Sequence, residues 1–586
     1  MKGGFRFGLV SLKGVLLLAL GAAIPAWAQA PASEDLSRGV ARISLMDGEV
    51  TVRRGDSGEW VAGVINAPLM TDDRIATGQN SRAEVQFDSA NVLRIGGNAE
   101  IHLALLENGR YHMEIARGTV TYRMRQSRAD IEMNTPSVSV RPARDGVFRL
   151  SVSESGESEI SARSGDVEVF TPKGTQWVYA GQTMMARGSA ADPEFQLVNG
   201  APVDDWDRWN ESRDRATQSG ASAQYVPPGV YGTEDLDAAG TWANVAPYGY
   251  VWRPAGVPAG WAPYRNGRWV WVNWYGWTWV GAEPWGWAPY HYGRWFFDAR
   301  WGWNWYPGGL EVTASWSPAL VGFFGYGGGV GVGVGVGFGF GNIGWVPLAP
   351  FETFHPWWGS AYAGGLNRGV SITNINVTAA YRNARVANGI SGVAAGDFTA
   401  GRFGNVQRVS GAQVQTAGLI SGRVPLNPSI ASRHFSDRAV TNVPRPSTNT
   451  QFYSRSRAAA VGSRPAGNSQ AQSGYHRFGE PGVPQNTRPP QAATGANAAG
   501  RQGSIQRFGE PGTKQNGGGT AGWRSFGTPS TGGRQPYNPP QSRPNGTASP
   551  QRSMPNNAAP RSVPAPSRPA GGGHPAAPKG GDKGHR

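Results

Sequence analysis

The sequence contains no cysteine among its 586 residues. Disulfide bonds, cysteine-ligated metal ions and thiol nucleophiles are therefore excluded, and core packing or binding partners must hold the protein together. Charge is also sparse, because only 16% of the residues are Asp, Glu, Lys or Arg. The net charge of +15 comes from residues 441–586, which hold 18 basic residues against 3 acidic ones, so the rest of the chain is nearly neutral.

Catalytic signatures are missing as well. The eight histidines form no H-E-x-x-H helix and no spaced set of metal ligands. They are His102, His112, His291, His355, His434, His476, His574 and His585. The sequence has no G-x-S-x-G turn, no P-loop, and no G-x-G-x-x-G that opens a helix after a strand. It therefore predicts a protein that is not an enzyme and needs no metal ion or cofactor.

Glycine, proline and tryptophan are abundant instead. The chain has 85 Gly, 44 Pro and 24 Trp. Gly and Pro together usually make up only about 12% of a protein, and here they clearly exceed that share. The length allows two or more domains, but this composition argues against a single large core.

The first residues have the pattern of a secretory signal peptide. Basic residues precede an apolar run over residues 15–24, and Ala26-Trp27-Ala28 forms an A-x-A cleavage site. The run is roughly half of the ~20 apolar residues that a membrane-spanning helix needs, so cleavage is favoured over an uncleaved anchor. The sequence predicts a signal peptide over residues 1–28 and an exported, periplasmic location in a bacterium.

Residues 40–200 are predicted to form a β domain. Apolar and polar residues alternate there in short segments, and no helical stripe of useful length occurs. Turn residues separate the segments, for example at Asp47-Gly48, Gly96-Gly97, Gly118 and Gly165-Asp166. Regular short strands with such turns are typical of an all-β sandwich, barrel or solenoid-like stack.

A series of motifs in this domain resembles the FecR family. The motifs are Asp73-Arg-Ile-Ala-Thr-Gly78, Ser81-Arg-Ala-Glu-Val-Gln-Phe87, Asn134-Thr-Pro136, Gly146-Val-Phe148 and Gly165-Asp-Val-Glu-Val169. FecR proteins are periplasmic regulators that relay a signal from an outer-membrane receptor to a sigma factor. The resemblance implies a β fold, the periplasm and a regulatory role. A FecR regulator also carries a cytoplasmic arm and a spanning helix before this domain, whereas here mostly the predicted signal peptide precedes it. We therefore expect any signalling to act through a separate membrane protein.

Residues 201–239 are predicted to be a connector that contains one short helix. Acidic residues precede basic ones, which suits a helix dipole, and Asp204 or Asp205 can cap the first turn. Trp206 and Trp209 lie three residues apart and so share one helix face. The helix is expected to dock on the β domain, and a solvated linker is the alternative.

A tryptophan-rich repeat fills residues 240–310. Gly260-Trp-Ala-Pro-Tyr264 recurs 26 residues later as Gly286-Trp-Ala-Pro-Tyr290, and a looser copy begins at Gly240. Three copies at a nearly fixed period indicate a repeated supersecondary unit. Tryptophans two residues apart share one face of a strand. Each unit is therefore predicted to be two short strands, and the units together an antiparallel meander with stacked tryptophan rows.

The tryptophan rows allow two interpretations. Tryptophan supplies much buried area to a small module, which would make the rows a core. Exposed rows would instead bind sugar rings or Pro-rich peptides, and flanking arginines would hold an anionic group or stack on the rings. Specific nucleic-acid binding is not expected, because the region is nearly neutral and the compartment is wrong. The candidate ligand-binding residues are Trp269, Trp271, Trp277, Trp279, Trp295, Trp303, Trp305, Arg268 and Arg294.

Residues 311–440 are predicted to hold glycine-rich and short-strand segments. Residues 319–341 are uncharged, but their Gly content and period of two favour extended chain over a membrane helix. Val370–Val377 is the clearest further strand. The repeats and the following Gly344-Trp-Val-Pro-Leu-Ala-Pro350 resemble an uncharacterised region that is often joined to FecR-type domains in exported bacterial proteins.

Residues 441–586 are predicted to be a disordered basic tail, because they hold too few apolar residues to offset the entropy cost of ordering. Arg477-Phe-Gly-Glu-Pro-Gly482 recurs within them as Arg507-Phe-Gly-Glu-Pro-Gly512. The repetition indicates either weak multivalent docking or low-complexity drift. Dispersed arginines favour anionic surfaces such as wall polymers or lipid head groups.

These features predict a mainly β protein with a FecR-type domain, a Trp-rich β-meander region and a disordered basic tail. The favoured function is that of a non-catalytic binding or scaffold protein of the cell envelope, with an envelope protein or a wall glycan as its partner. The alternative is a periplasmic signalling regulator of the FecR type. The sequence leaves the ligand and the oligomeric state open.

Overall fold

The computed structural model describes residues 38–440, 451–455 and 474–478, except for residues 190, 219, 329–339 and 359–369. All described residues belong to one compact unit. The predicted signal peptide, most of the Gly-Val repeat and most of the predicted tail lie outside the described residues. Within them, no helix is long and apolar enough to span a membrane.

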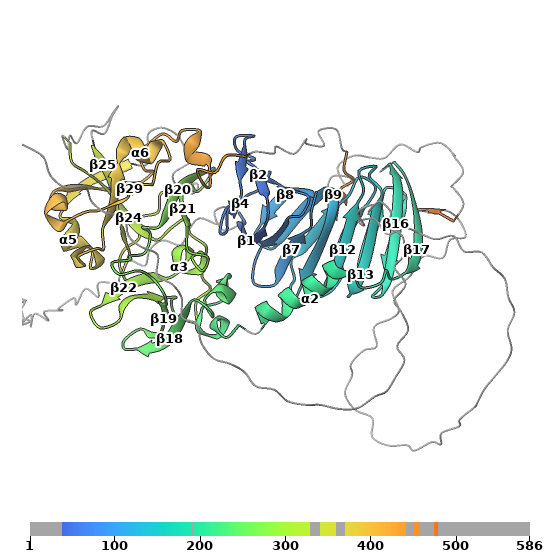
Figure 1. Ribbon diagram of the computed structural model, residues 1–586, viewed down its shortest axis with the longest axis horizontal. Helices are drawn as coiled ribbons and strands as arrows, with labels where there is room; N and C mark the ends of the chain where they lie inside the picture. Colours follow the sequence, from blue (N-terminus) through green and yellow to red (C-terminus); the bar gives the residue numbers. More distant parts are fainter. Residues whose placement is uncertain are drawn as a thin grey trace, which may run out of the picture. The chain divides into compact units, whose positions relative to one another are not determined.

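The β domain consists of two sheets that share one long strand, β9 (Figure 1). The first sheet has the order β4 (Pro68–Leu69), β1 (Ala41–Asp47), β6 (Arg82–Gln86), β7 (Asn91–Ile95), β9 (Arg110–Met124), β12 (Gly146–Val152), β13 (Ser158–Ser164), β16 (Gln182–Ser189) and β17 (Asp192–Asn199). The second has the order β3 (Trp60–Ala62), β2 (Val50–Arg53), β5 (Arg74–Thr77), β8 (Glu100–Glu107), β9, β10 (Asp130–Asn134), β11 (Ser139–Pro142), β14 (Val167–Thr171) and β15 (Gly174–Val178). The chain thus crosses repeatedly between two layers, and the prediction of a mainly β protein is confirmed.

Strand β9 passes from one sheet to the other at Gly118. Residues before Gly118 pair with β8 and β10, and residues from Gly118 onward pair with β12 and β7. Gly118 has a φ of 89°, and a Cβ atom there would lie 2.5 Å from the Cα of Ala99, so only glycine fits. The prediction of a turn at Gly118 is therefore wrong, because the residue bends a continuous strand.

Alternating side chains from both sheets build the core of this domain. Ile43, Val85 and Leu93 come from the first sheet and have no exposed surface. Val52 and Ile75 come from the second and are equally buried. This is the sheet-on-sheet packing that a period of two in the sequence favours.

Helix α2 (Asp205–Gln218) follows the β domain and runs beside the first sheet (Figure 1). An Asp204 carboxylate oxygen accepts the backbone N–H of Asp207 at 3.0 Å, so Asp204 caps the helix. The indole N–H of Trp206 donates to the hydroxyl of Thr121 in β9 at 2.8 Å. The helix is thus docked on the sheet through its tryptophan face.

The Trp-rich region contains three hairpins with equivalent strand register. Trp242 faces Trp252, Trp269 faces Trp279, and Trp295 faces Trp305. The strands are β18 (Gly240–Val245), β19 (Gly249–Pro254), β20 (Gly267–Val272), β21 (Gly276–Gly281), β22 (Arg294–Asp298) and β23 (Gly302–Tyr306). The repeat period therefore corresponds to one hairpin per copy.

The hairpins do not follow one another in a single meander as predicted. The first and third join in one sheet, β18-β19-β23-β22, whereas β20 and β21 pair only with each other among the described strands. The linking segments are longer than hairpin turns, and the Ala-Pro-Tyr residues of each are buried. Tyr264 and Tyr290 come from the two Gly-Trp-Ala-Pro-Tyr motifs, and Tyr264 donates to the carbonyl of Tyr290 at 2.8 Å. These motifs separate the hairpins and let the outer two meet.

A further sheet lies in residues 311–440. Its order is β26 (Val370–Ile375), β29 (Ala417–Gly422), β24 (Val321–Tyr326), β25 (Asn342–Pro347), β27 (Ser391–Ala394) and β28 (Gln407–Arg408). Strand β26 occupies most of the segment for which a strand is predicted. Short helices and turns complete the chain: η1 (Ser222–Tyr225), η2 (Thr233–Asp235), α3 (Trp287–His291), α5 (Val377–Ala380), η3 (Asn383–Arg385), α6 (Ala395–Thr399), η4 (Gly411–Val414) and η5 (Ala431–Arg433).

Two pieces of the predicted tail are ordered on the β domain. The short strand β30 (His476–Arg477) pairs with β17. The Ser454 hydroxyl donates to Glu132 of β10 at 2.7 Å, and the Arg455 guanidinium lies 4.3 Å from the ring centre of Phe170. The prediction of disorder is therefore wrong for these two segments, because side-chain contacts and strand pairing offset their ordering cost.

Candidate functional site: the junction of the two β regions

Three arginines of the β domain have fully buried side chains. Arg42 in β1 has no exposed surface, and Arg54 and Arg94 are each 1% exposed. Each of them contacts a segment that lies much later in the chain. Because arginine is almost never fully buried unless it is paired, these residues mark the points where later segments are fixed to the β domain.

Arg42 connects β1 to the segment before the Trp-rich region. Its Nη1 donates to Asp235 Oδ2 at 2.6 Å, and its Nη2 donates to Glu234 Oε1 at 2.8 Å. Its remaining donors bind Gln86 Oε1 at 2.7 Å and Asn66 Oδ1 at 2.9 Å. Burial disfavours the charged guanidinium, but the two carboxylates outweigh this effect and raise the pKa of Arg42 above its ordinary value.

Uncharged contacts extend this junction. The side-chain amide of Asn66 also donates to the carbonyl of Pro284 at 2.9 Å, and the Tyr275 hydroxyl donates to the carbonyl of Arg38 at 3.0 Å. The Trp-rich region is thus bound to the β domain along the start of the first strand, by both charged and neutral hydrogen bonds.

Arg94 fixes helix α2 to the first sheet. It donates to Glu84 Oε2 at 2.8 Å and to Asp214 Oδ1 in α2 at 2.6 Å. Arg213 of the same helix donates to Glu84 Oε1 at 2.9 Å. Burial alone would raise the pKa of Glu84, but the hydrogen bonds and charges of Arg213 and Arg94 lower it to about 2. This carboxylate stays ionised at neutral pH.

Arg54 connects the β domain to the Trp-rich region and to residues further on. It donates to the carbonyl of Trp271 at 3.3 Å and to that of Arg433 at 3.0 Å. Its Nη2 also binds Asp56 at 3.2 Å, and its Nε lies 3.8 Å from Asp73. One guanidinium therefore holds three separate parts of the chain.

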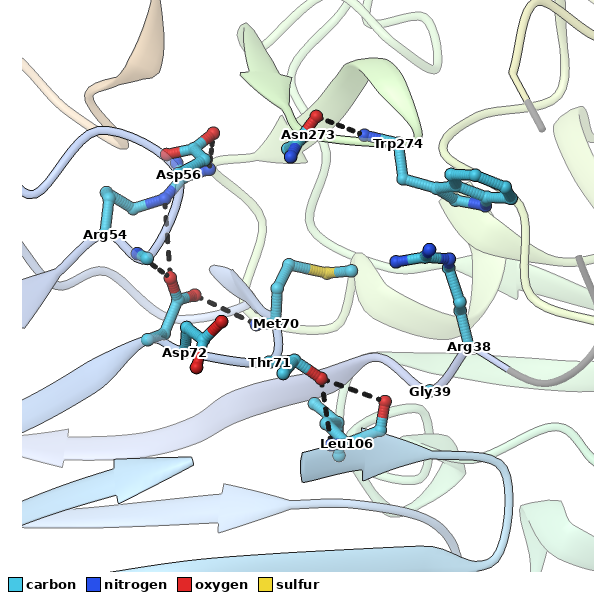
Figure 2. A pocket seen from close by; sticks show the side chains of 12 residues that line it. Arg38, Gly39, Arg54, Asp56, Met70, Thr71, Asp72, Leu106, Asn273 and Trp274 are labelled. Atoms are coloured by element: carbon cyan, nitrogen blue, oxygen red, sulfur yellow. Dashed lines mark hydrogen bonds and ion pairs between the residues drawn. The ribbon is translucent and has the colours of Figure 1, made fainter. Parts of the chain in front are cut away.

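A cavity of about 170 Å³ lies beside Arg54 at this junction. Figure 2 shows Arg54 and Asp56 on one side of it and Arg38 with Trp274 on the other. The Arg38 guanidinium stacks on the Trp274 ring, 3.9 Å from its centre. The carboxylate of Asp72 is largely exposed at the same place. Because its wall holds two cations, carboxylates and an aromatic ring, this cavity suits a small ligand that is polar or zwitterionic.

Asp73 lies in the wall of this cavity with almost no exposed surface. Its oxygens accept the backbone N–H groups of Gly55 at 2.8 Å and Met70 at 2.9 Å. Burial raises the pKa of Asp73 to about 6, although Arg54 and the two N–H groups act in the opposite direction. In the described residues, this cavity included, no group of three or more His, Asp or Glu side chains is placed to hold a metal ion.

The predicted tryptophan rows lie mostly inside the protein. Trp269, Trp277, Trp279, Trp295, Trp303 and Trp305 are at most 5% exposed, and Trp271 is half-buried. Buried ring faces are not available to an external sugar or peptide. The structure therefore favours the core interpretation over a binding face for these six residues.

The two arginines of the predicted site bind other parts of the protein. Arg268 donates to Asp437 Oδ1 at 2.7 Å and to the carbonyl of Gly401. The guanidinium of Arg294 lies 5.7 Å from the ring centre of Phe354. Stacking on a tryptophan ring of the repeats was one of the two roles predicted for these arginines. Arg294 instead lies beside a phenylalanine ring from outside the repeats.

A surface groove of about 280 Å³ is lined by two exposed aromatic rings. Trp301 is 51% and Phe297 is 41% exposed, and both line the groove together with Trp261, Trp303 and Asn388. Trp301 is not among the candidate ligand-binding residues predicted from the sequence. The corresponding position is aromatic in all three copies of the repeat, so the repeat pattern gives no signal that only the third copy faces solvent.

Comparison with known proteins identifies two family matches. A model of the FecR protein family matches residues 73–168, and a model of a family of unknown function, DUF6600, matches residues 233–352. No curated protein matches the chain. Two crystal structures of a candidate anti-sigma factor from Parabacteroides distasonis show 14% and 15% identity, with TM-scores of 0.20 and 0.19. Each covers 22% of this chain, and this chain spans 59% of theirs. The chain is thus a β protein that carries a FecR domain followed by a DUF6600 domain.

Proposed function

We propose that this protein is a non-catalytic regulator of the FecR type, which binds a partner in the bacterial cell envelope and passes the signal on through a separate membrane protein. The FecR family match at residues 73–168 carries this proposal. The secretory pattern over residues 1–28 supports export to the periplasm. A binding or scaffold role was the favoured prediction from sequence, and the family match supports the regulatory alternative better.

The buried arginines support a regulatory role for the two domains together. Arg42 binds Gln86 in the FecR domain and Glu234 in the DUF6600 domain. Arg54 pairs with Asp73 and binds the carbonyl of Trp271, which lie in the same two domains. A partner that displaces the Trp-rich region would break these contacts of buried charges, which costs free energy. A binding event on one domain would therefore change the state of the other.

A deletion strain tests this proposal. Loss of the gene should change transcription of a defined set of genes, such as an envelope-stress regulon, and the wild-type chain should restore it. The Arg42→Met chain should fail to restore it at equal protein level. Arg82→Ala is the matched control, because the contacts of Arg82 with Asp47 at 3.8 Å and with the Trp209 ring at 5.2 Å are weak and partly exposed, so this chain should complement fully. Unchanged transcription in the deletion strain would exclude the regulatory role.

The groove around Trp301 favours a second candidate function, the binding of a wall glycan. Trp301→Ala should lower retention of the mature chain on purified peptidoglycan sacculi by about tenfold in high salt, since a stacked ring is worth about 0.5–1.5 kcal/mol beyond its buried area. High salt suppresses the attraction of the basic tail to anionic polymers. Phe351→Ala is the control, because Phe351 is 78% exposed but lies outside the groove. Equal retention of both variants and the wild type would argue against a glycan site here.

A further inference from the structure

The edge of β17 is occupied by a segment of the distant tail. Strand β30 pairs antiparallel with β17, with Arg477 opposite Glu194 and His476 opposite Phe195. The other edge of β17 pairs with β16, so β30 extends the first sheet by one strand. An extended segment that adds to a sheet edge gains backbone hydrogen bonds, while its side chains provide specificity.

Side chains of the segment fit features of this edge. The Phe478 ring is 2% exposed, and its centre lies 4.4 Å from that of Phe195. Arg477 pairs with Asp192 at 3.1 Å and with Glu194 at 3.6 Å. The carboxylate pair therefore recognises the arginine of the segment, and the aromatic contact recognises the phenylalanine that follows it.

A cation–π contact binds the tyrosine that precedes these residues in the segment. The Arg187 guanidinium of β16 lies 3.6 Å from the ring centre of Tyr475. Arg187 is itself oriented by Glu194, whose carboxylate accepts from its Nε at 3.2 Å. The side chains of Tyr475, Arg477 and Phe478, together with the strand register, thus define a recognition site on β16 and β17.

The same motif occurs a second time in the chain. Arg477-Phe-Gly-Glu-Pro-Gly482 recurs 30 residues later as Arg507-Phe-Gly-Glu-Pro-Gly512. The residues that enter the carboxylate pair and the aromatic contact are identical in both copies. The position of Tyr475 is taken by Ile505, which is apolar and favours strands but cannot form the cation–π contact with Arg187.

We propose that the β17 edge, which binds Tyr475–Phe478, also binds the equivalent residues of the second copy, Ile505–Phe508, in place of the first. The two copies compete for one edge, since an edge accepts one strand. The first copy is the stronger ligand because it keeps the tyrosine contact. The second copy is held at high effective concentration by the chain itself, so it occupies the edge when the first copy is released.

The absence of cysteine allows a direct test by disulfide trapping in the full mature chain. The register places Gln196 opposite Tyr475, and residue 505 takes the same place when the second copy is bound. Directly opposed strand residues meet the distance requirement of a disulfide. A chain with Gln196→Cys and Ile505→Cys, in which Arg477→Ala and Phe478→Ala disable the first copy, should form the disulfide under mild oxidation.

The control places the second cysteine at Ala498, which is on the same tail but outside the motif. The Gln196–Ile505 pair should cross-link about fivefold more than the Gln196–Ala498 pair, since only the former is held in register. Adding Arg507→Ala and Phe508→Ala should reduce cross-linking to the level of the control. Equal cross-linking at Ala498 and Ile505, or cross-linking that is unaffected by these substitutions, would overturn the proposal. Circular dichroism of each variant checks that the sheet is intact.

Discussion

Replacement of Arg42 by methionine should lower the free energy of unfolding by about 3–5 kcal/mol, which is the usual effect of removing one partner of a buried ion pair. The substitution keeps most of the side-chain volume but leaves Glu234 and Asp235 without their cation, and Gln86 and Asn66 without their donor. Two carboxylates without a cation at a partly buried junction are the main cost.

Denaturation followed by circular dichroism measures this loss, and limited proteolysis locates it. Cleavage should become faster near η2, where the segment before the Trp-rich region is no longer held to β1. The matched control is Arg82→Met, because the Arg82–Asp47 pair is exposed and 3.8 Å apart and should change stability by less than about 1 kcal/mol. If both variants unfold alike, the Arg42 contacts do not hold the two domains together.

The sequence predicts a β domain because its strands obey a period of two, but it leaves a sandwich, a barrel and a solenoid-like stack open. Val85 and Leu93 belong to this alternating pattern, and both have no exposed surface. The same rule assigns Arg42 and Arg94 to solvent, since they occupy the opposite face of their strands. Later segments cover that face, and strand periodicity carries no information about what lies on it. The buried arginines were missed for this reason.

The repeat pattern likewise predicts the local strand pairing but not the arrangement of the hairpins. Spacings of two and 26 residues predict strands with paired tryptophans, and all three hairpins have such pairs. The pairing between hairpins depends on the buried motifs around Tyr264 and Tyr290, whose packing no local pattern specifies. The tail shows the same limit, because composition predicts disorder there whereas Phe478 finds a partner in Phe195, nearly 300 positions earlier.

Replacement of Trp269 by alanine separates the two interpretations of the tryptophan rows. Trp269 has no exposed surface, and its ring lies 4.6 Å from Phe323, 5.3 Å from Trp279 and 5.7 Å from Trp345, centre to centre. Two of these rings belong to the sheet beyond the repeats. Truncation of a buried tryptophan costs about 3–5 kcal/mol through lost contacts and the cavity left behind. We expect a loss of this size in the free energy of unfolding.

The exposed Trp301 is the matched control, because it belongs to the same repeat family and has 51% of its surface in solvent. Its replacement by alanine should change the free energy of unfolding by less than about 1 kcal/mol. Denaturant titrations of both variants measure this difference, and near-ultraviolet circular dichroism reports whether the aromatic packing persists. A Trp269→Ala chain as stable as the wild type would contradict the core interpretation, and one that also lost its retention on sacculi would restore the binding face. If Trp269→Ala lowers the free energy of unfolding and Trp301→Ala lowers only the retention on sacculi, the buried rows serve packing and any ligand binds in the groove at Trp301.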